Sequence, residues 1–504
     1  MMLLSSYHNL AYRDMISSLH EVNASGLIDR MNTAFKAIAP RFVPPLDPIY
    51  RPAILANRAF RAAVTESGAG VPLIIGLERP HGALSRFATV VYPDDHPDAA
   101  ASLPYVERIL KFLLWQRGGF RAYIGGPADI GEYLARVYSP TGARSFDHAF
   151  MGDSVYQRPF QVIACAPSDV PPAHEPEQAL GRHLDGYRVG FDLGASDLKV
   201  SAVANGEAVF SEEIVWETRR HSDPQYHYAH IVSAIRMAAE KLPRLDAIGG
   251  SAAGVYVDNR PMVASLFRGV PDDRYHLVRD MFLRIRDEFG VPLEVVNDGE
   301  VTALAGAMSL DDNAVLGLAM GSSEAAGYIT PQGNVTGWLN ELAFAPVDYA
   351  LEADVEEWSS DRGVGALYFS QQCVFRLAPA AGIEIPAGVT DAEKLKAVQA
   401  LLEAGHSGAR QIWESIGVYL GYSLAHYAEF YTSKIPDGGL KHVLVLGRVT
   451  SGCGGPIILE GAQRVLDAEF PALAAVIDVR LPDEKSRRVG QSIAAASLPL
   501  VARP

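Results

Sequence analysis

Asp192 follows an apolar run, and small or polar residues come directly after it in FDLGASDLKV, residues 191–200. Gly194 lets a ligand approach the backbone, Ser196 offers a hydroxyl, and Lys199 offers a positive charge that suits a phosphate. Carboxylate oxygens such as those of Asp192 are the ligands that Mg²⁺ prefers, directly or through water. An ordinary β-turn with a solvated aspartate is the alternative interpretation.

A second turn of small residues occurs in MGSSEAAGYI, residues 320–329. It has the same order of apolar strand, small-residue turn and apolar strand. Gly321, Ser322 and Ser323 would present backbone and hydroxyl donors to a second phosphate. Many hairpins carry Gly-Ser turns, so a plain hairpin is the alternative.

Asn297 and Asp298 stand between a predicted strand and a predicted helix in VVNDGEVTALAGA, residues 295–307. An aspartate at the start of a helix is often an N-cap. It is also well placed to act as a general base, because it would accept a proton from a substrate hydroxyl as a phosphoryl group arrives. Both interpretations stay open at this point.

The fourth segment is glycine-rich and follows a predicted strand in HVLVLGRVTSGCGGP, residues 442–456. Gly447, Gly452 and Gly454 would let an adenine and a ribose lie against the backbone. A flexible loop is the alternative. The order of the four segments is more informative than any one of them, since two phosphate-type turns flank a strand-end aspartate.

These residues need strands and helices to position them, and hydrophobic periodicity with turn residues predicts such elements. Asn205-Gly206 predicts a tight hairpin turn between strands 199–204 and 207–215. The other predicted strands are 71–78, 86–92, 122–126, 187–192, 245–249, 293–296, 315–320, 325–330 and 442–446. The predicted helices are 105–115, 128–138, 230–241, 275–289, 301–308, 391–404, 409–431 and 457–468.

Composition limits the class of protein. The 504 residues include 44 Lys and Arg against 59 Asp and Glu, a net charge of −15, and 48% are hydrophobic. The chain is therefore too apolar to be disordered, and its acidity argues against nucleic acid as a partner. Three scattered cysteines predict neither a disulfide framework nor a cysteine zinc site, and fit a reducing cytoplasm. We expect no membrane segment.

The chain divides at a segment rich in proline and charged residues, which predicts a linker over residues 171–186. Residues 1–170 form a predicted α/β extension of unknown role. Residues 187–504 contain all four segments that could do chemistry. A DNA-reading module in the extension is not expected, because the extension is long, contains several strands and has no compact basic stretch.

The four segments together resemble the actin-like ATPase superfamily, and within it the ROK family of repressors, open reading frames and sugar kinases. The resemblance implies a two-lobed, ribonuclease H-like α/β fold over residues 187–504 that uses ATP and Mg²⁺. It assigns the catalytic base to Asp298. It assigns ATP phosphates to two turns and adenosine to the glycine-rich loop, with the residues Asp192, Gly194, Ser196, Lys199, Gly321, Ser322, Ser323, Gly447, Gly452 and Gly454. Asp192 is the implied Mg²⁺ ligand.

On the substrate side the resemblance implies sugar contacts from Gly254, Asn297, Glu341 and Tyr368. The chain departs from the family here. Phe344 stands where the family has a histidine, and residues 356–372 contain no cysteine where the family has a zinc loop. We therefore expect no zinc site and an unusual substrate.

The sequence predicts a cytoplasmic ATP-dependent kinase that phosphorylates a hydroxyl of a sugar or polyol, with Asp298 as general base. The alternative is a non-catalytic sugar-binding sensor or regulator of the ROK type. A homodimer is a further expectation.

Overall fold

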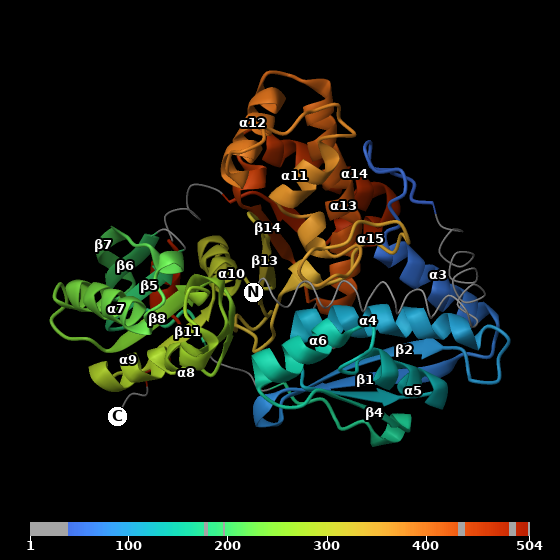
Figure 1. Cartoon of the computed structure of the whole chain (residues 1–504), viewed down its shortest axis with the longest axis horizontal. Coiled ribbons are helices and arrows are strands. Elements are labelled where there is room, and N and C mark those ends of the chain that lie inside the picture. Colours follow the sequence, from blue (N-terminus) through green and yellow to red (C-terminus); the bar gives the residue numbers. More distant parts are fainter. Residues whose placement is uncertain (1–38, 176–179, 195–196, 432–438, 483–489, 502–504) are drawn as a thin grey trace.

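The computed structural model describes residues 39–175, 180–194, 197–431, 439–482 and 490–501. These residues form an N-terminal domain and two lobes (Figure 1). Ser196, predicted to bind a phosphate, lies outside the described residues.

The N-terminal domain is a four-stranded sheet with the strand order β2-β1-β3-β4. β1 pairs antiparallel with both β2 and β3, and β3 pairs parallel with β4. Helix α4 is buried at almost every position and lies between this sheet and the rest of the molecule (Figure 1). The elements are α3 (Ala53–Glu66), β1 (Val71–Glu78), β2 (Leu84–Val91), α4 (Ser102–Arg117), β3 (Arg121–Gly125), α5 (Ala128–Val137), α6 (Ser145–Ala149), a π-helical turn (Phe150–Tyr156) and β4 (Gln161–Cys165).

The first lobe is built on a five-stranded sheet with the order β11-β8-β5-β6-β7. β5, β6 and β7 form an antiparallel meander, whereas β8 and β11 run parallel to β5. Helix α17 returns from the end of the chain and packs on β5 and β8. The elements are β5 (Tyr187–Leu193), β6 (Asp197–Ala204), β7 (Glu207–Val215), α7 (Pro224–Ala239), β8 (Ala247–Ala252), β9 (Val255–Val257), β10 (Arg260–Val263), α8 (Tyr275–Arg279), α9 (Met281–Phe289), β11 (Leu293–Asn297) and α17 (Gln491–Ala496).

The second lobe repeats this arrangement in a four-stranded sheet with the order β13-β12-β14-β15. Its first strand, β12, pairs antiparallel with the next strand and parallel with β14. The elements are α10 (Asp298–Leu310), β12 (Val315–Met320), β13 (Glu324–Ile329), α11 (Gln371–Leu377), α12 (Asp391–Glu403), α13 (Ser407–Tyr431), β14 (His442–Leu446), α14 (Gly454–Glu469), α15 (Pro471–Ala474) and β15 (Asp478–Arg480). The repeated strand order is the actin-like two-lobed fold.

Most predicted elements are present, including the hairpin at Asn205-Gly206, where both residues have positive φ. The helix predicted over 275–289 is broken at Asp280 into α8 and α9. Helix α7 begins at Pro224, six residues before the predicted start, because Asp223 caps it and proline suits the first helical position.

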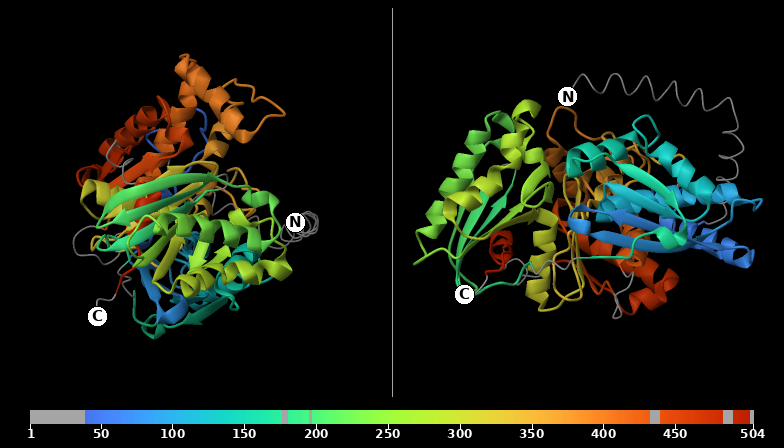
Figure 2. Two further views of the ribbon diagram at one scale, coloured as in Figure 1. Left: turned by 90° about the vertical axis from the view of Figure 1, so that its left-hand side faces the viewer. Right: turned by 90° about the horizontal axis from the view of Figure 1, so that it is seen from below.

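The N-terminal domain and the second lobe share one hydrophobic core, which contains both Trp115 of α4 and Trp413 of α13. A separate core lies between the sheet and the helices of the first lobe. The two further views agree that the N-terminal domain lies against the second lobe (Figure 2). Residues His174 and Glu175 of the predicted linker still contact the N-terminal sheet, through a bridge to Leu84 and a hydrogen bond from Ser85.

Candidate functional site

Asp298 is the first residue of α10 and directly follows β11. The N-cap of this helix is Asn297, whose Oδ1 accepts a hydrogen bond from the Gly299 N–H at 2.7 Å. The Asn297 amide also donates to the Gly254 carbonyl at 2.7 Å. The N-cap is therefore Asn297 and not Asp298, whose carboxylate lies in the first turn and interacts with the backbone N–H of Gly299.

The strands β5, β8 and β11 are parallel neighbours in one sheet. Their register aligns Asp192 of β5 with Val296 of β11, which is two residues before Asp298. In the sheet register Asp192 of β5 is opposite Ser251 of β8, and Ser251 is opposite Val296 of β11. The Ser251 hydroxyl donates to Asp192 Oδ1 at 2.6 Å and so orients this carboxylate. The carboxyl ends of parallel strands are where α/β sheets bind ligands.

Two carboxyl groups of this site, those of Asp298 and Glu341, have strongly raised pKa values. Burial raises the pKa of Asp298 to about 6, and the negative charge of Asp192 acts in the same direction. Burial raises the pKa of Glu341 to about 7, assisted by the charge of Asp298. The charge of Asp192 thus acts on Asp298 and that of Asp298 on Glu341, and we call these three residues the acidic cluster. Perturbed acids of this kind are typical of functional sites.

The segment that carries Glu341 is held by the N-terminal domain. The backbone N–H of Glu341 donates to the Trp115 carbonyl at 2.9 Å, and that of Asn340 donates to the Gln116 carbonyl at 2.8 Å. These carbonyls belong to the last turn of α4, where a helix has no acceptor partners of its own. Tyr431 adds a hydrogen bond from its hydroxyl to Asn340 Oδ1 at 2.9 Å. The extension therefore positions a predicted sugar ligand.

Two further carboxyl groups, Glu300 and Glu324, were not predicted from the sequence. Both are about 95% buried, and burial raises the pKa of each to about 8. Glu300 follows Asn297 by three residues, so it resembles the glutamate of a helix capping box. Glu324 could have been identified from the sequence more easily than Glu300, because it is a charged residue at the start of the otherwise apolar strand EAAGYI.

Helix α10 connects the acidic cluster to the second lobe. It begins at the end of β11 and then packs on β13 and β12. Gly299 and Gly327 allow this contact, because a Cβ on Gly327 would lie 2.1 Å from the Gly299 carbonyl oxygen. Asp298 is thus fixed where the two sheets meet through one helix.

The second predicted phosphate turn, at Gly321, Ser322 and Ser323, joins β12 to β13. Gly321 N–H donates to the Ser323 carbonyl at 3.0 Å, and both serines are exposed. Gly447 follows β14, the parallel neighbour of β12, and has a φ of 103°. A Cβ on Gly447 would lie 2.4 Å from the Met320 carbonyl oxygen. The predicted phosphate turn and the start of the predicted adenosine loop are therefore adjacent.

The other two glycines of the adenosine loop differ from each other. Gly452 is exposed and has a positive φ of 64°. Gly454 is buried at the start of α14, where a Cβ would lie 2.3 Å from Trp413 Nε1. The structure thus gives Gly454 a packing role against Trp413, whereas Gly452 remains accessible.

Near the first predicted phosphate turn, Lys199 of β6 is directly opposite Asp192 of β5. Its side chain is 47% exposed, and its Nζ lies 3.5 Å from Asp197 Oδ1. Gly194 is partly buried, and its carbonyl accepts a hydrogen bond from the Trp216 indole at 2.9 Å. Lys199 is therefore accessible beside Asp192, as the sequence prediction requires.

Tyr368 does not join this site. It is 1% exposed, its hydroxyl donates to Asp348 Oδ2 at 2.6 Å, and its ring packs against Tyr419 with 4.9 Å between centroids. The Arg376 guanidinium covers the ring at 4.7 Å. The prediction that Tyr368 contacts the sugar is therefore wrong, because its side chain is buried in the core next to α13.

The residues around Asp192 fit a magnesium ion. Mg²⁺ in nucleotide sites usually takes one or two protein carboxylates and keeps waters and substrate phosphates as its other ligands. Asp192 supplies one carboxylate that Ser251 orients, while burial raises its pKa against the opposing effects of Ser251 and Lys199. Within the described ranges, no group of three or more His, Cys, Asp or Glu side chains is arranged to hold a metal.

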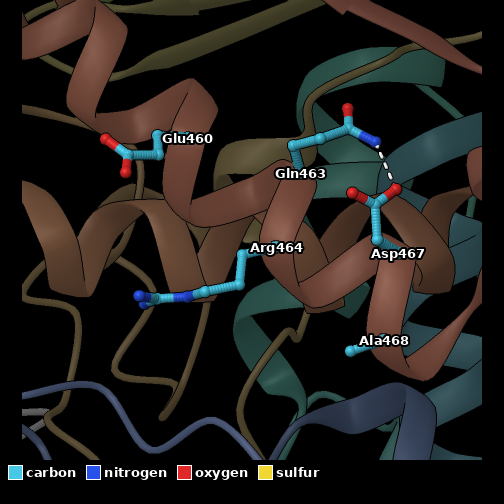
Figure 3. Close-up of a pocket in the computed structure, with 5 residues that line it drawn as sticks. All are labelled: Glu460, Gln463, Arg464, Asp467 and Ala468. Carbon is cyan, nitrogen blue, oxygen red and sulfur yellow. Dashed lines mark hydrogen bonds between the residues drawn. The ribbon is translucent and has the colours of Figure 1, made fainter.

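Two hollows on the described structure are compared as places for a ligand. One, a cavity of about 640 Å³, lies where the N-terminal domain and both lobes meet, and Gly254, Asn297 and Glu300 line it. The other is a shallow hollow on α14, lined by Glu460, Gln463, Arg464, Asp467 and Ala468 (Figure 3). Its residues come from one helix face, and Gln463 donates to Asp467 Oδ1 at 2.7 Å (Figure 3). The cavity that contains Asn297 is next to Asp298, whereas the hollow on α14 is not, so we place the candidate site at the acidic cluster.

Of the helices in the described part of the chain, none has the length and apolar character needed to cross a membrane.

Comparison with known proteins gives structural matches only. No family model and no curated protein matches the chain. A ROK hexokinase from Thermus thermophilus matches at 15% identity over 61% of this chain and 97% of that chain, with a TM-score of 0.47. A ROK family transcriptional regulator, a homologue of the E. coli MLC protein, matches at 15% identity over 62% of this chain and 78% of its own, with a TM-score of 0.48.

A ROK family glucokinase from Streptomyces griseus, solved with glucose and AMPPNP, matches at 16% identity. That match covers 62% of this chain and 98% of the glucokinase, with a TM-score of 0.44. The fold assignment itself rests on the strand order of the two lobes. The chain is thus similar to solved members of the ROK family, kinases and a regulator alike.

Proposed function

We propose that this chain is a divergent ROK-type kinase that transfers a phosphoryl group from ATP to a hydroxyl of a sugar or polyol. The observation that carries the proposal is the position of Asp298. Asp298 directly follows β11, which runs parallel to the Asp192 strand in the same sheet, and burial together with the charge of Asp192 raises the pKa of its carboxylate to about 6. A base with this pKa is ionised near neutral pH and accepts a proton readily.

In the proposed reaction Asp298 orients the substrate hydroxyl and accepts its proton as the phosphoryl group arrives. Glu341 and Glu300 face the same cluster, and their raised pKa values let them hold protons near neutral pH. A protonated carboxyl donates one hydrogen bond and accepts others, which suits sugar hydroxyls. The backbone of Gly321 and Gly447 would bind the nucleotide. When bound at Asp192, Mg²⁺ would neutralise charge on the phosphates.

A second candidate is a sugar-binding regulator without turnover. The observation that favours it is the direct backbone contact between Glu341 and the end of α4. A sugar bound at Glu341 would change the contacts of the N-terminal domain, which would then report occupancy to a partner.

A coupled ADP-release assay over hexoses, amino sugars and cyclitols separates the two candidates. The kinase predicts ADP release that depends on one class of sugar and is lost in Asp298→Asn. Asp272→Asn, at an exposed aspartate outside the site, is the matched control. Measurable ATP and sugar binding without turnover on any substrate would support the regulator instead.

A further inference from the structure

The cavity of about 640 Å³ has walls from all three parts of the molecule, and we call it the junction cavity. Arg79 and Tyr156 come from the N-terminal domain, Tyr256 comes from the first lobe, and Glu300 and Trp338 come from the second lobe. Its volume falls within the range of cavities that hold drug-sized ligands, so it exceeds the need of a single sugar ring.

Unsatisfied polar groups line this cavity. Among the described residues, Arg79 Nε, Tyr256 Oη and Glu300 Oε1 are buried atoms with no hydrogen-bond partner. Arg79 and Glu300 are each at least 95% buried. A buried polar atom without a partner is costly, and three such atoms around one cavity indicate a ligand that supplies their partners.

The charges of the cavity favour a neutral ligand. The Arg79 guanidinium is already paired, because its terminal nitrogens donate to Glu175, Ser85 and the Gly337 carbonyl. Asp258, Glu294 and Glu300 add carboxyl groups to the walls. Arg286 also lines the cavity, and its guanidinium pairs with Asp287 at 3.0 Å. An anion would therefore meet these carboxyl groups opposite cations that already have partners, whereas hydroxyl groups both donate and accept.

The cavity also offers aromatic surface of the kind that covers the apolar face of a sugar ring. The indole of Trp338 is fixed by a hydrogen bond from its Nε1 to Glu175 Oε2 at 3.2 Å, and Tyr156 adds a second ring to the lining. Asn297 and Gly254, next to Asp298, line the same cavity. The cavity therefore reaches Asn297, the residue directly before Asp298.

We propose that the junction cavity binds the non-reacting part of an extended carbohydrate, such as the second ring of a disaccharide. The N-terminal domain then supplies a substrate subsite. This inference rests on the proposed function, because it assumes that the reacting sugar lies at Asp298.

Equilibrium binding of sugars to the full chain tests the proposal without relying on turnover. The probes are glucose, maltose, cellobiose and lactose, measured by calorimetry. We expect at least one disaccharide to bind ten times or more tighter than glucose. Trp338→Ala and Tyr256→Phe should each reduce that preference at least threefold. Tyr50→Phe, which also removes a buried tyrosine hydroxyl but lies outside the cavity, should leave the preference unchanged.

The outcomes separate this proposal from the kinase proposal. Disaccharide binding that depends on Trp338, without ADP release on any sugar, supports the subsite and removes the kinase. ADP release on glucose with no tighter binding of any disaccharide overturns the subsite and retains the kinase. A preference that survives both cavity substitutions also overturns the subsite.

Discussion

Asp298 must be ionised to accept a proton, yet burial and the charge of Asp192 both favour its protonated form. The resulting pKa of about 6 predicts that kcat/KM falls about tenfold per pH unit below pH 6, because only the ionised base is active. A pH profile from pH 5 to pH 8 with saturating ATP measures this. A rate that stays constant down to pH 5 would mean that Asp298 is not the base.

Glu324 gives a prediction about stability. Burial raises its pKa from 4.5 to about 8, so the folded state retains a proton that the unfolded state releases. Stability is therefore lost as the pH rises from about 4.5 toward 8, by about 2 kcal/mol between pH 6 and pH 8. Glu324→Gln should reduce the wild-type loss by about 2 kcal/mol when urea denaturation is compared at the two pH values, while Glu300, whose pKa is also about 8, still contributes.

The matched control for Glu324 is Glu460→Gln on the exposed face of α14, which should keep the wild-type pH dependence. Equal pH dependence in Glu324→Gln and wild type would show that Glu324 is ionised in the folded protein.

At the scale of single residues, the sequence was informative where a residue stood at the end of a strand. Asp192 and Asp298 were predicted because each follows an apolar run. Glu300 and Glu324 were missed, because a glutamate in the first turn of a helix or at a strand end usually faces solvent. Their burial depends on contacts with residues far along the chain, such as Tyr427 and Gly365 for Glu324, which local sequence does not encode. Tyr368 was wrongly assigned for the same reason.

Among the elements, the turn after β14 depends on glycine. Gly447 has a φ of 103° and its backbone touches that of Met320, so Gly447→Ala should destabilise the protein by about 2 kcal/mol. Nucleotide affinity should fall as well, because the turn would shift. Thermal unfolding and calorimetry with AMPPNP measure the two effects.

Gly321→Ala is the comparison for Gly447→Ala. The nearest atom to a Cβ at Gly321 lies 3.6 Å away, so this variant should keep wild-type stability. If Gly447→Ala is as stable as Gly321→Ala, the close contact between Gly447 and Met320 is not present in solution.

Element types were predictable where turn residues and periodicity agree, as at Asn205-Gly206 and over α12 and α13. The residues at which elements begin and end were less predictable. The break at Asp280 has no sequence signal such as glycine or proline, and an ion pair between Asp280 and Arg260 of β10 accompanies it. Tertiary contacts of this kind override helix propensity.

At the scale of the whole molecule, the N-terminal domain is bound to the second lobe by a buried ion network. Asp361 of the second lobe accepts from Arg108 at 3.1 Å and from Arg144 at 2.5 Å, and Lys111 Nζ lies 3.5 Å away. Burial raises the pKa of Asp361, but Arg108 and Lys111 outweigh that effect and the pKa is lowered. Glu107 and Asp147 complete a balanced set of three cations and three carboxylates.

Removal of one charge from a buried network leaves the others uncompensated, so Asp361→Asn should destabilise the protein by about 3 kcal/mol. Urea denaturation of Asp361→Asn against the exposed control Asp272→Asn measures this. Equal stability of the two variants would show that the network does not stabilise the contact between the N-terminal domain and the second lobe.

The sequence predicted a separate extension, a linker and a kinase-like part, because composition changes near residue 171. It did not predict that α4 would hold the Glu341 segment or that one core would span both parts. Residues 115 and 341 are too far apart in the chain for any local pattern to pair them. The actin-like two-lobed fold, in contrast, was predicted from the resemblance carried by the order of short motifs.

The central claim is that Asp298 is the general base of a phosphoryl transfer. The most direct test is kcat of Asp298→Asn against wild type, with ATP affinity measured in the same preparations. The account predicts a loss of at least a hundredfold in kcat with ATP affinity within threefold of wild type. A variant that binds ATP normally and keeps kcat within threefold of wild type would contradict it.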